Sequence, residues 1–438
     1  MAPTVPPVPS RKPGYRELLR TPGAWTFLLP GFLARQPFAM LTLSIVLLVE
    51  HTTGSFGTAG AVSAATGVAL ALFAPRSGRL VDRFGQRAVL LPGVLLHAAS
   101  VVLLVVLALS RAPLWALLLA AVPAGASMPQ VSAMVRARWA HLLRDDPDTG
   151  GARLLPTAAA FESVTDELTF VIGPVLATAL CTGVHPAAGL LTEAVLTVTG
   201  GLLFAAQRRS APPARRTTPA HGVRRASALS VPGVRVLVVA FLGIGAVFGG
   251  MQVSLAAFTD QIGRPGINGV LYGIFAAGNM LSAVVYGTVS WRSSLRRRLL
   301  TAYGLLTLTT APLWAVDAVP LLAVLGLLAG ASVAPAMITG FTLVERLSPP
   351  GVRTEAFTWL AGAIALGQAG AATAAGQLAD GFGASTGFTV PLVSTALALV
   401  TVAVLRGRLV PSAGAPEADG GGRGTSRGED HRPPVPVD

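Results

Sequence analysis

Long apolar runs separated by narrow bands of charge are the feature that most constrains how this chain folds. Each run is about 20 residues long, the length that an α-helix needs to cross the ~30 Å hydrocarbon layer of a bilayer. Only 12% of the 438 residues are charged and 52% are hydrophobic, whereas soluble domains carry about 25% charged residues. The sequence therefore predicts an all-α membrane protein that crosses the bilayer many times.

We predict twelve membrane spans in two groups of six. The amino-terminal six-helix half covers residues 24–206 and the carboxyl-terminal six-helix half covers 233–405. A cytoplasmic tail (1–23), a central cytoplasmic loop (207–232) and a disordered cytoplasmic tail (406–438) complete the chain. The predicted spans are 24–49, 57–75, 88–109, 112–135, 154–182, 186–206, 233–260, 267–289, 299–317, 319–344, 354–379 and 386–405.

The basic residues, which give a formal net charge of +13, fix the expected orientation. They concentrate in the tails and in every second connection, while the other connections hold only Arg111 and Arg264. This alternation follows the positive-inside rule, so it predicts cytoplasmic termini and excludes nucleic acid as the partner that the charge serves. Since Cys181 is the single cysteine, the chain has no disulfide framework and no thiolate metal cluster. The preference for Arg over Lys fits a GC-rich bacterial genome.

A charged, glycine-punctuated segment lies between the second and third apolar runs and reads Gly78-Arg-Leu-Val-Asp-Arg-Phe-Gly-Gln-Arg87. Gly78 and Gly85 have no Cβ and are expected to allow a sharp turn and close packing. The segment resembles the signature G-x-L-a-D-R-x-G-R-[KR] of the major facilitator superfamily. The matching positions are Gly78, Leu80, Asp82, Arg83, Gly85 and Arg87, and Gln86 departs from the usual Arg.

This resemblance implies a twelve-helix transporter built from two parallel six-helix repeats, with a substrate site between the halves. The two halves share short matches in the same order, such as Ala124-Gly-Ala-Ser127 and Ala329-Gly-Ala-Ser332. By resemblance, Gly78, Asp82, Arg83, Gly85 and Arg87 form a conformational latch with the amino end of span 354–379. A small-molecule substrate, protons and the lipid bilayer are the implied partners, and a monomer is the family's usual state.

Charged side chains inside predicted spans are the candidates for function, because each costs free energy in hydrocarbon. Glu162 and Asp166 lie four residues apart and share one helix face, whereas Glu167 points about 100° away. Arg35 in the first span is the expected counter-ion, and Gln252 and Asn279 are polar candidates for the same cavity. The alternative is a static network of ion pairs and helix-joining hydrogen bonds. Conversely, His97 and Glu193 are expected to be structural.

These residues predict a proton-coupled antiporter that exports a small molecule across the plasma membrane, without cofactor or metal. Gly173-Pro174 resembles the paired residues of the antiporter motif of efflux proteins, although Thr169, Ala177 and Thr178 depart from its flanking positions. Proton-coupled nutrient uptake is the first alternative, and a non-transporting membrane sensor or scaffold is the second. An enzyme is not expected, because we find no nucleophile–base motif or nucleotide-binding loop.

Overall fold

The computed structural model describes residues 15–144, 154–213, 228–289, 292–348 and 353–409, and every regular element within these ranges is helical. The helices of the amino-terminal half are α1 (Tyr15–Leu19), α2 (Ala24–Thr53), α3 (Phe56–Phe84), α4 (Gln86–Leu109), α5 (Leu114–Ala126), α6 (Val131–Arg144), α7 (Leu155–Gly183) and α8 (Ala188–Ala206). Those of the carboxyl-terminal half are α9 (Pro232–Gln261), α10 (Asn268–Thr288), α11 (Leu295–Thr310), α12 (Val319–Leu347), α13 (Arg353–Phe382) and α14 (Thr389–Val404).

Helices occupy all twelve predicted ranges, and ten segments of the described chain are long and apolar enough to cross a membrane. The two predicted spans outside this group correspond to α11, which has only 16 residues, and to α13. The fourth predicted span is broken between Ala126 and Val131 into α5 and α6. A Pro at position 129 lies in this break, and Pro lacks the N–H that a continuous helix needs.

The predicted connection between the second and third spans is helical. The segment 78–87 is not a loop, because α3 continues to Phe84 and α4 starts at Gln86. The turn rests on Gly85 alone, whose φ of 86° suits a residue without a Cβ. Gly78 lies inside α3 with no heavy atom within 4 Å of an added Cβ, so the expected turn and close packing at Gly78 are wrong.

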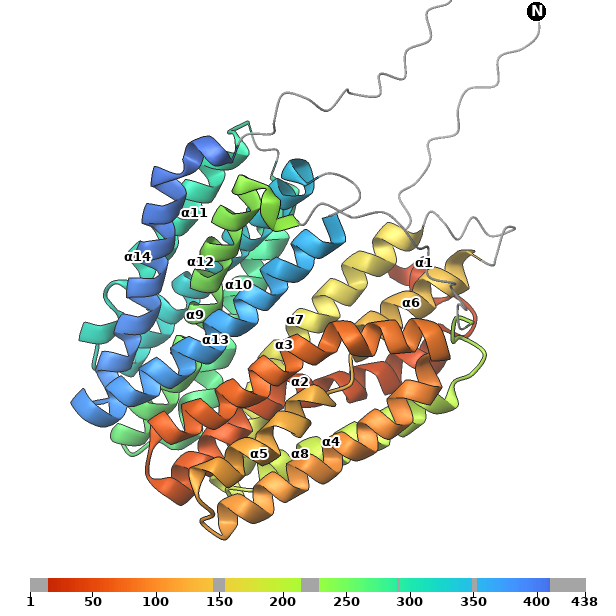
Figure 1. Cartoon of the computed structure of the whole chain (residues 1–438), viewed down its shortest axis with the longest axis horizontal. Coiled ribbons are helices and arrows are strands. Elements are labelled where there is room, and N and C mark those ends of the chain that lie inside the picture. Colours follow the sequence, from red (N-terminus) through yellow and green to blue (C-terminus); the bar gives the residue numbers. More distant parts are fainter. Residues whose placement is uncertain (1–14, 145–153, 214–227, 290–291, 349–352, 410–438) are drawn as a thin grey trace, which may run out of the picture.

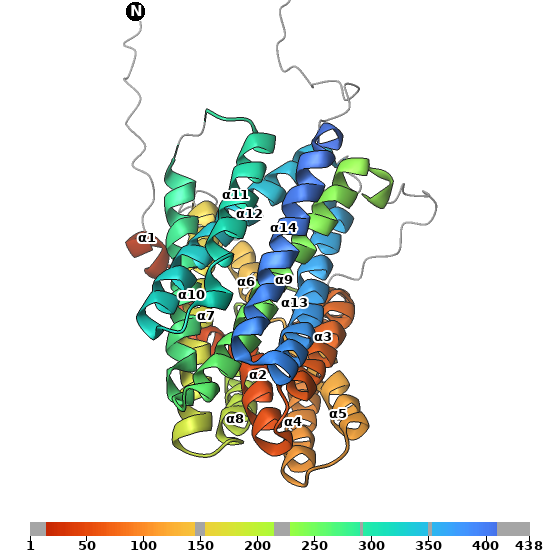
Figure 2. The same cartoon turned by 90° about the vertical axis from the view of Figure 1, so that its left-hand side faces the viewer.

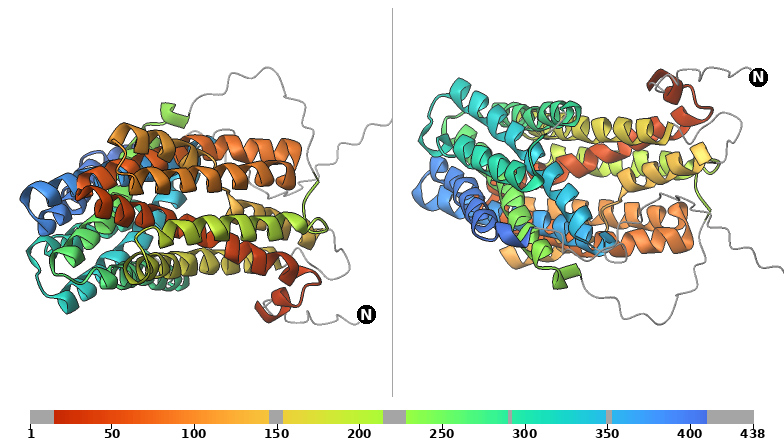
Figure 3. Two further views of the ribbon diagram at one scale, coloured as in Figure 1. Left: turned by 90° about the horizontal axis from the view of Figure 1, so that it is seen from below. Right: turned by 90° about the horizontal axis from the view of Figure 1, so that it is seen from above.

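The helices of the amino-terminal half and those of the carboxyl-terminal half form two groups. These groups lie side by side in Figures 1 and 2 and in both views of Figure 3. We call the end where α2 begins and α9 begins the tail end, and the opposite end the far end. One hydrophobic cluster at the far end joins the halves, because it combines Val46 and Val62 with Val253, Ala372 and Ala375. The cluster at the tail end of the amino-terminal half, around Phe27, Trp139 and Phe204, contains residues of that half alone.

Close helix packing within the carboxyl-terminal half depends on Gly330 of α12. A Cβ added there would lie closer than 3.0 Å to the backbone oxygen of Phe275 in α10, so the helices would have to separate. Gly326, one turn earlier, has no heavy atom within 4 Å of an added Cβ. These two glycines of one helix therefore differ in the space available for a side chain.

We expect Gly330→Ala to destabilise the purified protein by about 1–3 kcal/mol, the usual cost of overpacking. Gly326→Ala should be neutral or stabilising by up to about 1 kcal/mol, because Ala favours helix. Thermal unfolding of both variants in detergent measures the difference. Equal melting temperatures would contradict the packing that we describe.

The predicted structural role of His97 agrees with its surroundings. His97 and Glu193 are fully buried, with Nε2 of His97 2.8 Å from Oε1 of Glu193 and Nδ1 2.8 Å from the carbonyl oxygen of Ala124. Thr197 donates a hydrogen bond to the same carboxylate at 3.1 Å. These bonds tie α4, α5 and α8 together and satisfy polar groups that would otherwise be costly to bury.

Candidate functional site

Glu162 on α7 forms the centre of a buried polar cluster. Its side chain is 1% exposed and forms an ion pair with Arg35 of α2, which is 4% exposed. The indole Nε1 of Trp139 on α6 donates a hydrogen bond to Oε1 of Glu162 at 2.7 Å. Three helices thus meet at one carboxylate, and each of its oxygens has a donor.

Asp166, one turn further along α7, joins the same cluster. Its Oδ1 lies 3.3 Å from Nη1 of Arg35 and accepts a hydrogen bond from Ser132 at 2.8 Å. Its Oδ2 is 2.7 Å from Nη2 of Arg136. Asp166 is 23% exposed, so this part of the cluster is open on one side.

The cluster balances its charges, since two arginines face two carboxylates. Charge balance matters because an unpaired buried ion is strongly destabilising. Arg35 is the counter-ion that the sequence suggested, but Ser132, Arg136 and Trp139 were missed. Arg136 and Trp139 were predicted to lie in a connection, whereas they belong to α6, which continues to Arg144. The four-residue spacing of Ser132 and Arg136 on one helix face was the available signal.

Glu167 has a different environment from its neighbours on α7. It is half-buried, and its Oε2 accepts a hydrogen bond from Nδ2 of Asn279 on α10 at 3.3 Å. No arginine or lysine of the described chain lies within ion-pair distance of this carboxylate. Two predicted site residues therefore meet, one from each half, at an acid without a counter-ion.

Gln252 of α9 lies outside these contacts, although it is buried with 3% exposure. No hydrogen bond between Gln252 and the α7 acids is found among the described residues. Its Oε1 has no partner there, and the same is true of Oε1 of Gln36 and Oδ1 of Asn279. These three amide oxygens are therefore buried acceptors without a donor among the described residues.

The segment that matched the family signature is only partly described. The side chain of Asp82 lies outside the described residues, and Arg83 and Arg87 are exposed, with the Arg83 guanidinium 5.0 Å from the ring centroid of Phe84. Gln86, which departs from the signature, is 3% exposed and accepts a hydrogen bond from Nε of Arg138 at 2.8 Å. Gln86 thus has a local structural role, because its hydrogen bond with Arg138 joins the start of α4 to α6.

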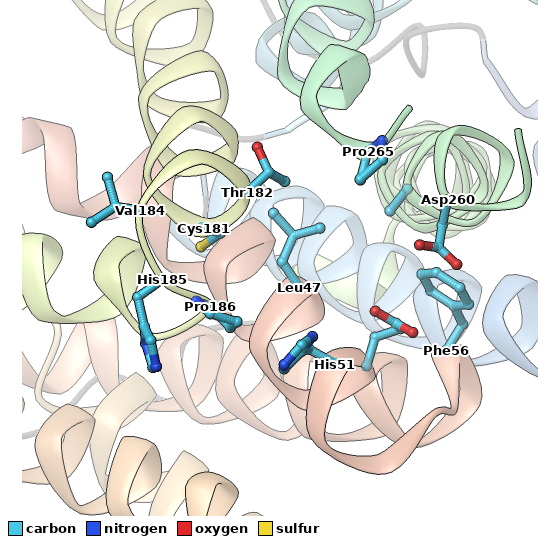
Figure 4. Close-up of a pocket in the computed structure, with 12 residues that line it drawn as sticks. Leu47, His51, Phe56, Cys181, Thr182, Val184, His185, Pro186, Asp260 and Pro265 are labelled. Atoms are coloured by element: carbon cyan, nitrogen blue, oxygen red, sulfur yellow. The ribbon is translucent and has the colours of Figure 1, made fainter. Parts of the chain in front are cut away.

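A pocket of about 340 Å³ lies at the far end, between α2, α7 and α9. Figure 4 shows Asp260 beside Phe56 at one edge, and His51, Cys181 and His185 at other edges. Glu50 also lines it, so two acids border this pocket. Leu47 of the pocket is twelve residues beyond Arg35, or ~18 Å along the helix. The pocket is therefore separate from the cluster on α7.

Comparison with known proteins identifies the fold. The family model described as Major Facilitator Superfamily matches residues 27–318 and 265–436. The search of curated proteins found no match. A structure of the nucleoside transporter NupG is similar with a TM-score of 0.71 at 12% identity, over 88% of this chain and 98% of that one.

A bacterial homologue of the iron transporter ferroportin is similar in two states, both at 19% identity. Its inward-facing structure gives a TM-score of 0.68, over 88% of this chain and 98% of that one. Its outward-facing structure gives 0.58, over 88% and 99%. The fold of these transporters is shared, and the family model covers most of the sequence. This chain belongs to the Major Facilitator Superfamily, a family of multi-pass membrane transporters.

Proposed function

We propose that this protein is a proton-coupled secondary transporter that exports a small polar or cationic molecule across the plasma membrane by alternating access. The observation that carries this proposal is Glu167, a half-buried acid without a described counter-ion, hydrogen-bonded across the two halves to Asn279. It lies next to Asp166, whose charge is balanced by arginines. Ionisable groups within membrane spans commonly mark proton or substrate paths.

The three acids of α7 differ in their partners, and we infer their roles from this difference. Glu162 and Asp166 each have an arginine partner, so their charge is compensated in the absence of any cargo. A charge at Glu167 has only the neutral Asn279 beside it, and a buried charge without a partner is costly. A proton or a cationic cargo would each relieve this cost. Competition between the two for one carboxylate is the basis of antiport.

The unpaired amide oxygens support a cargo that donates hydrogen bonds. Oε1 of Gln36, Oε1 of Gln252 and Oδ1 of Asn279 are acceptors without described partners. An ammonium or hydroxyl group would satisfy them, and a buried acceptor without a donor costs about 1–3 kcal/mol. The related structures include nucleoside, iron and peptide transporters, so the fold itself does not select a solute class.

The tail end lies in the cytoplasm in this proposal, because the arginine-rich connections are at the tail end and such connections favour the cytoplasmic side. The cluster that joins the halves lies at the far end, around Val62 and Ala375. An inward-facing form, closed at the far end, is consistent with this and with the higher TM-score to the inward-facing relative. In that form the α7 acids can exchange protons and cargo with the cytoplasm.

Proton release in inside-out membrane vesicles tests the proposed direction and coupling. Vesicles containing the protein are acidified inside, and a pH-sensitive dye reports protons that leave as compounds of a cationic and polar panel are added. We expect one or more compounds to release protons through the wild-type protein. Vesicles with Glu167→Gln should show the signal of vesicles that lack the protein.

The alternatives give different results in the same assay. Uptake by symport would move protons together with the cargo from the lumen to the outside. In the acid-loaded vesicles the dye would then respond only when the compound is preloaded into the lumen. A sensor or scaffold would move no compound in either arrangement, which radiolabelled versions of the panel would show. Proton release that is unchanged in Glu167→Gln would exclude Glu167 as the coupling group.

A further inference from the structure

The far ends of α3 and α13 are joined by one carboxylate that bridges the two halves. Oδ2 of Asp380 accepts a hydrogen bond from the hydroxyl of Ser55 at 2.7 Å and from the N–H of Gly57 at 2.8 Å. Oδ1 accepts from the N–H of Phe56 at 2.9 Å. Asp380 belongs to α13, whereas its three donors belong to the start of α3.

These contacts are an anion cap on a helix, supplied from the other half. The first N–H groups of a helix have no partner within it and carry partial positive charge. Phe56 and Gly57 are the first two residues of α3, and Ser55 is its N-cap residue. The carboxylate of Asp380 therefore satisfies backbone groups that would otherwise face solvent. Movement of the halves at this end must break all three bonds.

The sequence around Asp380 repeats the segment that first resembled the family signature. Gly376-Gln-Leu-Ala-Asp-Gly-Phe-Gly383 has Gly, Leu, Asp, Phe and Gly at the same places as Gly78-Arg-Leu-Val-Asp-Arg-Phe-Gly85. In both cases the Phe ends the helix, α3 at Phe84 and α13 at Phe382. The final glycines share a backbone conformation, with φ 86° and ψ 156° at Gly85 and φ 97° and ψ 156° at Gly383.

The two helices run antiparallel. A Cβ at Gly57 would meet Gln377, and one at Gly60 would meet Ala372, so residue numbers rise along α3 as they fall along α13. Both helices rise ~1.5 Å per residue.

The glycines at which α3 and α13 approach each other most closely lie at the far end. A Cβ at Gly57 or Gly376 would meet the other helix, whereas one at Gly67 or Gly370 would have no heavy atom within 4 Å. Leu80 and Phe84, at the tail end of α3, are 46% and 53% exposed. Because helices are stiff, drawing the tail ends together about this crossing separates the far ends.

We propose that Asp380 of α13 and the start of α3 form a latch that holds the far end of the transporter closed. The three hydrogen bonds of Asp380 are lost when the far end opens, so they stabilise the form that is closed at this end. This inference rests on the proposed alternating access but not on its proton coupling. It assigns Asp380 and Ser55 a role as positioning residues.

Distances between spin labels, measured by double electron–electron resonance, test the latch without cargo or a proton gradient. On a Cys181→Ser background, Ser110→Cys with Ala318→Cys reports the far end. Arg208→Cys with Glu345→Cys reports the tail end. All four label sites are exposed, and the hydroxyl of Ser110 bonds only within its own helix among the described residues.

Asp380→Asn should raise the population with longer far-end and shorter tail-end distances by about threefold or more, as expected for loss of a charged helix cap. Ser55→Ala removes one of the three bonds and should shift it less. The matched control is Asp317→Asn, because Asp317 is an exposed far-end acid of the same half that makes no bond to the other half among the described residues. This variant should change nothing.

Distributions for Asp380→Asn that match the wild type would overturn the latch, as would an equal shift in Asp317→Asn. If the vesicle assay fails while these shifts occur, proton coupling is wrong and the latch stands. Size-exclusion profiles confirm that each labelled variant is folded.

Discussion

Replacing Arg35 with methionine should remove most of the folded protein, and adding Glu162→Gln to that variant should restore it. The single change leaves Glu162 with a charge, 1% exposure and no cation, and breaking a buried pair in this way costs about 3–5 kcal/mol. The glutamine introduced in the double variant is neutral and can still accept the hydrogen bond from Trp139. Thermal unfolding and size-exclusion chromatography of tagged variants measure the recovery.

The matched control for this prediction is Arg136→Met. Arg136 also pairs with an acid of α7, but its side chain is 47% exposed. Exposed ion pairs contribute about 0–1 kcal/mol, so this variant should unfold close to the wild type. A double variant no more stable than Arg35→Met alone would show that the Arg35–Glu162 pair does not determine the stability of this cluster.

Glu167→Gln should abolish transport driven by a proton gradient while exchange of cargo across the membrane continues. The substituted glutamine keeps an acceptor for Asn279 but cannot take up or release a proton. Gradient-driven accumulation in proteoliposomes should therefore fall to the level of empty vesicles. Exchange of labelled for unlabelled cargo, which needs no net proton movement, should persist.

Glu193→Gln is the control for this result, because it also neutralises a buried acid of the same half. Glu193 is bound to His97 and Thr197 in a network away from the α7 acids, and glutamine keeps an acceptor for them. Gradient-driven transport should be retained in this variant. If both variants lose it equally, general loss of buried charge explains the effect and Glu167 has no special role.

Most of the fold was predictable because membrane spans are encoded by apolar length and by the placement of arginine. The limits of the predictions lay at helix ends. Arg136 and Arg138 were assigned to a connection because of their charge, but α6 carries both, and Arg138 is buried with hydrogen bonds to Gln86 and Ser210. Charge marks membrane depth, and it does not tell whether a backbone remains helical there.

The candidate site was only partly predictable for a related reason. Helical spacing placed Glu162 and Asp166 on one face, and Arg35 was the evident cation nearby. The pairing that distinguishes Glu167 from its neighbours depends on which helices pack against each face of α7, and local sequence does not contain that information. Asp380 was missed because charged candidates were sought only inside the predicted spans. Its partners are groups at the start of α3, including the backbone N–H of Phe56.

Proton release on cargo binding, measured with purified protein in weakly buffered detergent solution, tests the central claim most directly. The probe is the compound that the vesicle panel identifies, and a pH dye reports protons as it is added to the wild type and to Glu167→Gln. The account predicts release from the wild type and binding without release in the variant. Equal release from both proteins would contradict the assignment of proton exchange to Glu167.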